Sequence, residues 1–74
     1  MVEQRKLQID NIRKVLSEAE GKDVPVVEEI FIAEFCVKSG VSEHKVQEYI
    51  RQLELAGYVY KYVLEGKVII RHLK

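Results

Sequence analysis

The chain has 74 residues, of which 47% are hydrophobic and 32% charged, so it can build one small core and not two. Twelve Lys and Arg residues balance twelve Asp and Glu residues, which excludes the strongly basic composition typical of many nucleic-acid-binding proteins. One cysteine and two histidines exclude an internal disulfide and form no zinc-binding pattern.

The zero net charge is a cancellation between segments. Residues 1–14 carry four basic and two acidic side chains, residues 16–36 carry one and six, residues 37–60 three of each, and residues 61–74 four and one. We therefore expect a dipolar molecule that can offer one positive face to a polyanion. No apolar run approaches the roughly 20 residues of a membrane span, and the N-terminus leads into no signal core, so we expect a cytoplasmic protein with no membrane partner.

Helical spacing of apolar residues predicts a first helix over residues 3–19, ending at Gly21. Residues 24–25 then favour a very short strand or an extended segment before the next helix, because proline restricts the residue before it to extended conformations. A second helix is expected over residues 26–38, closed by Ser39 and Gly40.

Ser42 is a preferred N-cap and begins a third predicted helix, residues 42–56, with Gly57 after it. Its buried stripe is expected to be Val46, Tyr49, Ile50 and Leu53. The apolar period then changes from 3.6 to 2, which predicts a β-hairpin of strands 58–64 and 67–73 around the turn Glu65-Gly66.

Three helices followed by a hairpin, with the second and third helices joined by Lys38-Ser39-Gly40-Val41-Ser42, resemble the winged helix-turn-helix family over essentially the whole chain. We therefore expect a single α+β domain, residues 1–74. The stretch from Lys22 through Gly57-Tyr58 is similar to small archaeal winged-helix proteins, and less closely to the C-terminal winged-helix domain of archaeal minichromosome maintenance helicases.

Catalytic chemistry is not expected from this sequence. It has three serines, no threonine, no nucleophile motif and no phosphate-binding glycine loop, and Cys36 falls among apolar residues of the second helix. We expect a protein that is not an enzyme, with no cofactor, no metal and no small-molecule substrate. Glu28 and Glu29 are interpreted as first-turn charges that favour the helix dipole.

The resemblance implies that the third helix reads DNA and that the hairpin, as the wing, contacts the backbone beside it. The buried stripe leaves a donor-rich outward face, and the hairpin adds cations, so the expected DNA-binding residues are His44, Lys45, Gln47, Arg51, Gln52, Lys61, Lys67 and Arg71. Glu48, near the centre of this face, could accept from a cytosine amino group, pair with Arg51 or repel phosphate. A solvated polar helix, and cations that only protect an edge strand, are the alternatives.

The second helix carries apolar residues around much of its circumference, which favours a partner subunit. The expected homodimer interface comprises Leu7, Phe31, Ile32 and Phe35, with Met1 and Val2 as possible additions. The alternative is a second helix buried between the hairpin and the other helices. Tyr58, Tyr60 and Tyr62 alternate along the hairpin and are expected to pack on the helices rather than to stack on bases.

The sequence thus predicts a small regulator of transcription that binds double-stranded DNA as a homodimer. The rival hypothesis is a protein-interaction module on the same frame with no nucleic-acid role. Neutral net charge and Glu48 favour the rival, whereas charge segregation and the Gln, Arg and Lys side chains of the third helix favour DNA.

Overall fold

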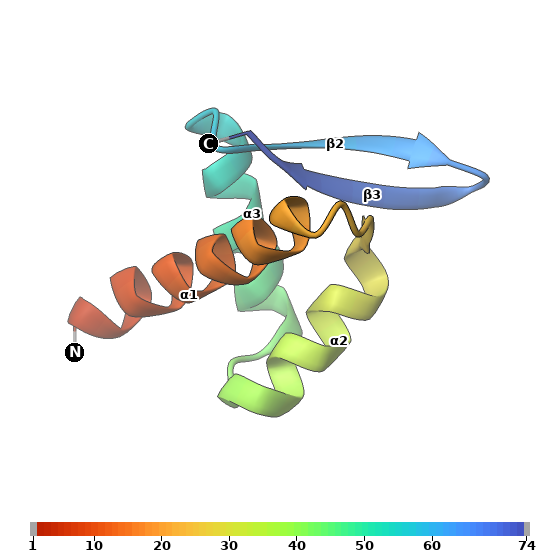
Figure 1. Ribbon diagram of the computed structural model, residues 1–74. Coiled ribbons are helices and arrows are strands. Elements are labelled where there is room, and N and C mark those ends of the chain that lie inside the picture. The colour runs from red at the N-terminus through yellow and green to blue at the C-terminus, as the bar shows by residue number, and fades with distance from the viewer. Residues whose placement is uncertain (1, 74) are drawn as a thin grey trace.

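The computed structural model describes residues 2–73, with side chains from residue 5 onward. The elements in chain order are α1 (Val2–Gly21), β1 (Val26–Val27), α2 (Glu28–Ser39), α3 (Glu43–Leu55), β2 (Val59–Leu64) and β3 (Lys67–His72) (Figure 1). This confirms the predicted α+β class of three helices followed by a β-hairpin. The topology is winged-helix-like. No helix in the described part of the chain is long and apolar enough to cross a membrane.

Helix α1 follows the predicted periodicity and extends it by a residue or two at each end. Ile12 and Leu16, one turn apart, are fully buried against the rest of the domain, whereas Val15 is 41% exposed. The buried stripe of α1 is therefore narrow, because the helix packs on its neighbours along one line.

Helix α2 begins two residues later than predicted. Val26 and Val27 form strand β1 and pair with Ile70 and Ile69 of β3, so their backbone groups serve the sheet rather than the helix. The first turn of α2 then carries Glu28 and Glu29, as expected from the dipole. At the other end Gly40 adopts the left-handed conformation, with φ 76°.

Helix α3 is fixed at its start by the predicted cap. The backbone N–H of Lys45 donates to Ser42 Oγ at 3.3 Å, which satisfies one of the unpaired donors of the first turn. The predicted stripe is confirmed in full, since Val46, Tyr49, Ile50 and Leu53 are all buried. The rotation of α3 about its axis is thereby set, and with it the side chains that face outward.

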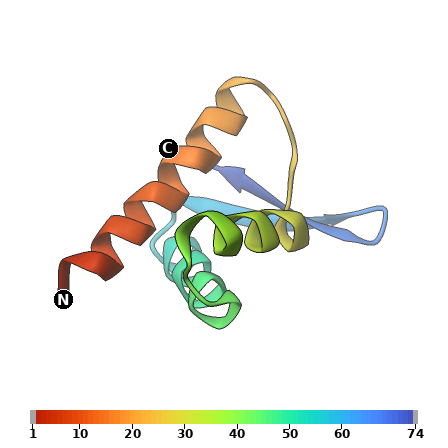
Figure 2. The same cartoon turned by 90° about the horizontal axis from the view of Figure 1, so that it is seen from below.

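The hairpin turns through Glu65 and Gly66, whose φ angles of 52° and 79° are both positive, as a two-residue type I′ turn requires. The sheet is antiparallel in the order β1-β3-β2, so β3 is central and β2 is an edge strand. In Figure 1 the helices lie below the hairpin, and in Figure 2 the end of α1 and helix α3 lie on opposite sides of the strands.

The core lies between the helices and the inner face of the sheet. It contains side chains from five of the six elements and comprises Ile12, Leu16, Phe31, Ile32, Phe35, Val46, Tyr49, Ile50, Leu53, Val59 and Ile70. Phe31, Ile32 and Phe35, which were expected at a dimer interface, are thus buried inside the monomer, and that expectation is wrong for them. The alternative of an internally buried second helix accounts for these three residues. The wide apolar circumference of α2 arises because sheet and helices cover it from several directions.

Candidate nucleic-acid interface

The outward face of α3 presents the polar side chains that the sequence placed there. His44, Lys45, Gln47 and Arg51 are exposed, and Gln52 is half-buried. All of these except Lys45 line a shallow hollow of about 420 Å³ on the helix, together with Glu48. The face therefore offers donors that can reach base edges or phosphates, with one carboxylate among them.

Lys61, on β2, points toward the helices and is held by carboxylates. Its Nζ lies 2.7 Å from Glu28 Oε2 of α2 and 3.9 Å from Glu54 Oε1 of α3. Arg51 lines the same hollow as these three residues. The structure therefore brings Arg51 and Lys61 together, as expected, but places two acids beside them.

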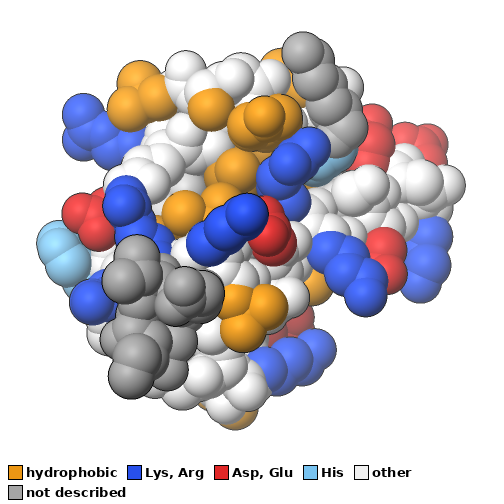
Figure 3. All heavy atoms as spheres, turned by 90° about the vertical axis from the view of Figure 1, so that its left-hand side faces the viewer, with side chains coloured by type: hydrophobic (Ala, Val, Ile, Leu, Met, Phe, Trp, Pro, Cys, Tyr) orange, Lys and Arg blue, Asp and Glu red, His pale blue; other side chains and the backbone are white. Residues whose placement is uncertain are grey.

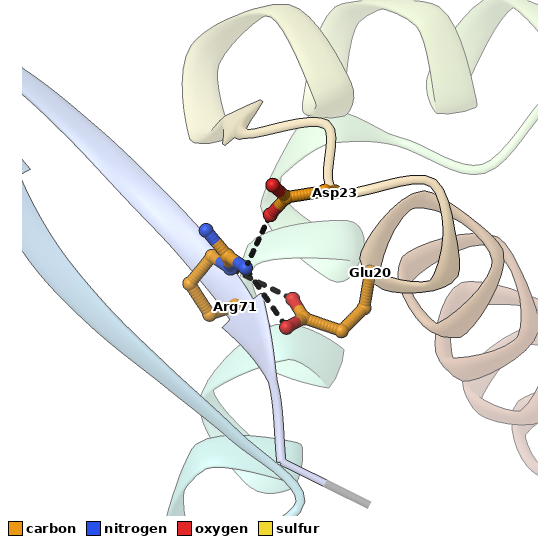
Figure 4. Close-up of polar contacts among 3 residues, drawn as sticks. All are labelled: Glu20, Asp23 and Arg71. Atoms are coloured by element: carbon orange, nitrogen blue, oxygen red, sulfur yellow. Dashed lines mark hydrogen bonds and ion pairs between the residues drawn. The ribbon is translucent and has the colours of Figure 1, made fainter.

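Arg71, on β3, lies on the other face of the sheet. It pairs across the ladder with Tyr60, which alternates with the inward-facing Lys61. Its guanidinium donates two hydrogen bonds to Glu20 at 2.7 and 2.8 Å and lies 3.5 Å from Asp23 Oδ1 (Figure 4). Hydrogen bonding from Arg71 lowers the pKa of Glu20, and the same contact raises the pKa of Arg71. Arg71 thus ties the end of α1 to the sheet and does not share a face with Arg51.

Lys67, the first residue of β3, is exposed beside the hairpin turn. It lines a separate hollow with Gly66 and with Glu28 and Glu29 from the start of α2. Glu28 borders both this hollow and the one that contains Arg51 and Lys61. The register nevertheless pairs Lys67 with Leu64, on the face of the sheet that carries Arg71.

The predicted spatial sorting of charge is wrong in part. Carboxylates of α2 and α3 are interleaved with the cations of the hairpin, and Arg71 is engaged with acids on the far side of the sheet. Among the residues that the structure describes, Lys45, Arg51 and Lys67 make no ion pair within 4.0 Å. These three define the available cations of the candidate interface. Sequence reasoning missed Glu28 as the partner of Lys61 and Glu20 as the partner of Arg71, because each pair joins residues far apart in the chain.

The hairpin tyrosines do not all pack on the helices. Tyr58 does, with the Arg13 guanidinium carbon 4.0 Å from its ring centroid. Tyr60 and Tyr62 lie on the outer face of the sheet, where their rings stack on each other with centroids 6.0 Å apart. Their expected packing on the helices is therefore wrong, because Val59 and Lys61 occupy the inward positions of β2.

Leu7, the remaining residue of the expected dimer interface, is half-exposed on α1. Figure 3 shows the side of the molecule toward which the start of α1 points, where Lys and Arg side chains are spread among hydrophobic and acidic ones. This side forms no continuous basic patch. Met1 lies outside the described residues, as does the side chain of Val2.

No group of three or more metal-ligating side chains exists in the part of the chain that the structure describes. Comparison with known proteins found no matching family model, no matching curated protein and no matching solved structure.

Proposed function

We propose that this domain binds double-stranded DNA, with α3 in the major groove and the hairpin turn beside the phosphate backbone, and that it regulates transcription. The observation that carries the proposal is the outward face of α3. The Ser42 cap and the buried stripe hold it in a fixed rotation, and it presents His44, Gln47 and Arg51 around one hollow. A helix with a rigid base and exposed bidentate donors suits readout of base edges.

The contact set is narrower than the sequence alone predicted. Lys45 and Arg51 extend from α3, and Lys67 lies beside the hairpin turn, in a hollow that shares Glu28 with the hollow lined by Arg51. Three phosphate contacts per domain correspond to a slope of log K against log salt of about −3, since each contact contributes about −0.9. Binding by one domain is expected to be weak. The resemblance to small archaeal winged-helix proteins supports this role.

Titration of a fluorescent duplex at roughly 50 and 200 mM salt tests the proposal. We expect Arg51→Ala to weaken binding and to make the salt slope shallower by about 1, and Lys67→Ala to do the same. Arg5→Ala and Lys22→Ala are matched controls, because Arg5 is exposed on α1 and Lys22 is exposed in the turn that follows α1. They should leave the slope unchanged.

Binding that is absent or independent of salt contradicts the proposal, as does equal weakening by the control substitutions. Such results favour the second candidate, a protein-interaction module. The specific observation for that candidate is that Lys61 and Arg71, two of the predicted phosphate contacts, are already satisfied by the domain's own carboxylates. Under that hypothesis the exposed apolar side chains of the surface, rather than its cations, would carry the interaction.

A further inference from the structure

Strand β2 has one open edge along its whole length. The sheet order β1-β3-β2 leaves no strand beyond β2 among residues 2–73, and Figure 1 shows nothing running beside its outer edge. The two residues that flank the type I′ turn, Leu64 and Lys67, form a hydrogen-bonded pair in such a hairpin. Tyr58 belongs to the same set, because its carbonyl accepts from the Leu73 N–H at 2.8 Å. The even-numbered residues of β2 therefore direct their backbone groups toward β3. Val59, Lys61 and Val63 direct theirs to the open edge.

This edge lacks the usual protection against pairing with another chain. Proline and glycine are absent from β2, and its single charged residue is Lys61. The Lys61 side chain is turned beneath the sheet by Glu28 and Glu54, so its charge does not guard the edge. Exposed apolar side chains remain on both faces of the strand: Val63 is 69% exposed, Leu64 49% and Tyr60 43%.

We propose that β2 is a homodimerisation strand, which pairs antiparallel with β2 of a second copy of this chain about a two-fold axis through Tyr62. A two-fold axis perpendicular to the sheet keeps each side chain on its own face, so it allows only registers centred on a residue of the strand. Centring on Lys61 would set the Lys61, Glu28 and Glu54 clusters of the two copies directly against each other, and each cluster has two carboxylates for one cation, so the contact is unfavourable. Centring on Tyr62 avoids this.

The Tyr62-centred register gives every exposed apolar side chain of β2 a neighbour. Tyr60 faces the partner's Leu64, and Tyr62 faces its own copy, so the two stacked tyrosine pairs merge into one cluster on the outer face. On the inner face Val63 meets the aliphatic stem of the partner's Lys61. The backbone groups of Lys61 and Val63, which point to the open edge, then find their partners across the axis.

A second copy is the occupant that this edge fits, because pairing it closes the assembly. Two copies form a six-stranded sheet in which both β2 edges are used. The outer strands of that sheet are the two copies of β1, which are only two residues long and are poor templates for further strands. The product is a closed dimer and not a fibre. This proposal does not depend on DNA binding, and its test contains no DNA.

Sedimentation equilibrium between about 5 and 500 μM protein tests the proposal. We expect the wild-type chain to sediment as a dimer in the upper part of this range. Val63→Lys replaces the apolar contact with the stem of the partner's Lys61 by a charged side chain that must lose water beside the axis, and it should raise the dissociation constant at least about tenfold. Val37→Lys is the matched control, since Val37 is 86% exposed on α2 and should leave the constant unchanged. Circular dichroism shows whether each variant is folded.

Disulfide trapping fixes the register. In a Cys36→Ala background, Tyr62→Cys brings two thiols to a directly opposed pair that does not share backbone hydrogen bonds, and we expect a covalent dimer on oxidation. Lys61→Cys should give none, because its copy is offset along the strand. A wild-type chain that is monomeric at the highest concentration overturns the proposal. A dimer that Val63→Lys leaves intact overturns it too, as does trapping at residue 61 in place of residue 62.

Discussion

The rotation of α3 about its axis decides which side chains DNA can reach, and two leucines of this helix test it. Leu53 is 3% exposed and packs in the core, whereas Leu55 is 76% exposed. The same substitution at two positions of one helix removes the same atoms, and the change in helix propensity from Leu to Ala is small, a few tenths of a kcal/mol at most. Any difference between Leu53→Ala and Leu55→Ala therefore measures the burial of Leu53.

Leu53→Ala is expected to cost about 3 kcal/mol of unfolding free energy, because buried leucines cost about 2–5 kcal/mol when truncated. In a domain of this size each kcal/mol lowers the melting temperature by about 4–8 °C, so the expected decrease is about 12–24 °C. Leu55→Ala should change the free energy by less than about 0.5 kcal/mol.

Thermal and urea unfolding followed by circular dichroism measure both variants. Equal costs at the two positions would refute the described rotation of α3. The assignment of His44, Gln47 and Arg51 to the outward face would fail with it, because the same rotation places them there.

Two further predictions concern the carboxylates beside the hairpin cations. Glu28→Gln releases Lys61 for phosphate, so it should tighten duplex binding and steepen the salt slope by up to about 1. Glu29→Gln removes the same charge one residue away without freeing Lys61, so it should increase the affinity for duplex DNA by less. Equal increases for the two variants would contradict the role of the ion pair. Arg71 lowers the pKa of Glu20, so this contact contributes stability above the unfolded pKa near 4.5 and loses it as pH falls through the folded value. In urea unfolding between pH 3 and 7, the wild type should lose its advantage over Glu20→Gln on acidification, and a constant difference would contradict this linkage.

Local signals in the sequence predicted most of the fold. Ser42, Gly40 and the Glu65-Gly66 turn each act through backbone groups within a few residues, and each does what its chemistry predicts. The change of apolar period likewise placed the hairpin strands within one residue of their bounds. The start of α2 was misplaced because pairing of Val26 and Val27 with β3, more than 40 residues away, overrides their local environment.

The candidate site was harder to predict, because charge pairing depends on distant partners. Nothing near Lys61 in the sequence indicates that Glu28 lies 2.7 Å away, and Arg71 is 51 residues from Glu20. The outward residues of α3 were found correctly, since a single periodicity fixes them. The surroundings of the second helix were predicted wrongly because its apolar circumference is ambiguous. Such a circumference predicts contact on several sides, but it does not say whether a partner or the domain itself provides that contact.

The central position of β3 has a consequence for how the domain forms during translation. Of the elements described, β3 leaves the ribosome last, yet it joins β1 to β2 and contributes Ile70 to the core. The helices can appear early on the nascent chain, but they have no sheet to pack on until this strand emerges. Until then β1 lacks its pairing partner and both edges of β2 are exposed. Many copies of the nascent chain lie close together on a polysome, so strands of neighbouring chains must be kept from pairing there before β3 emerges.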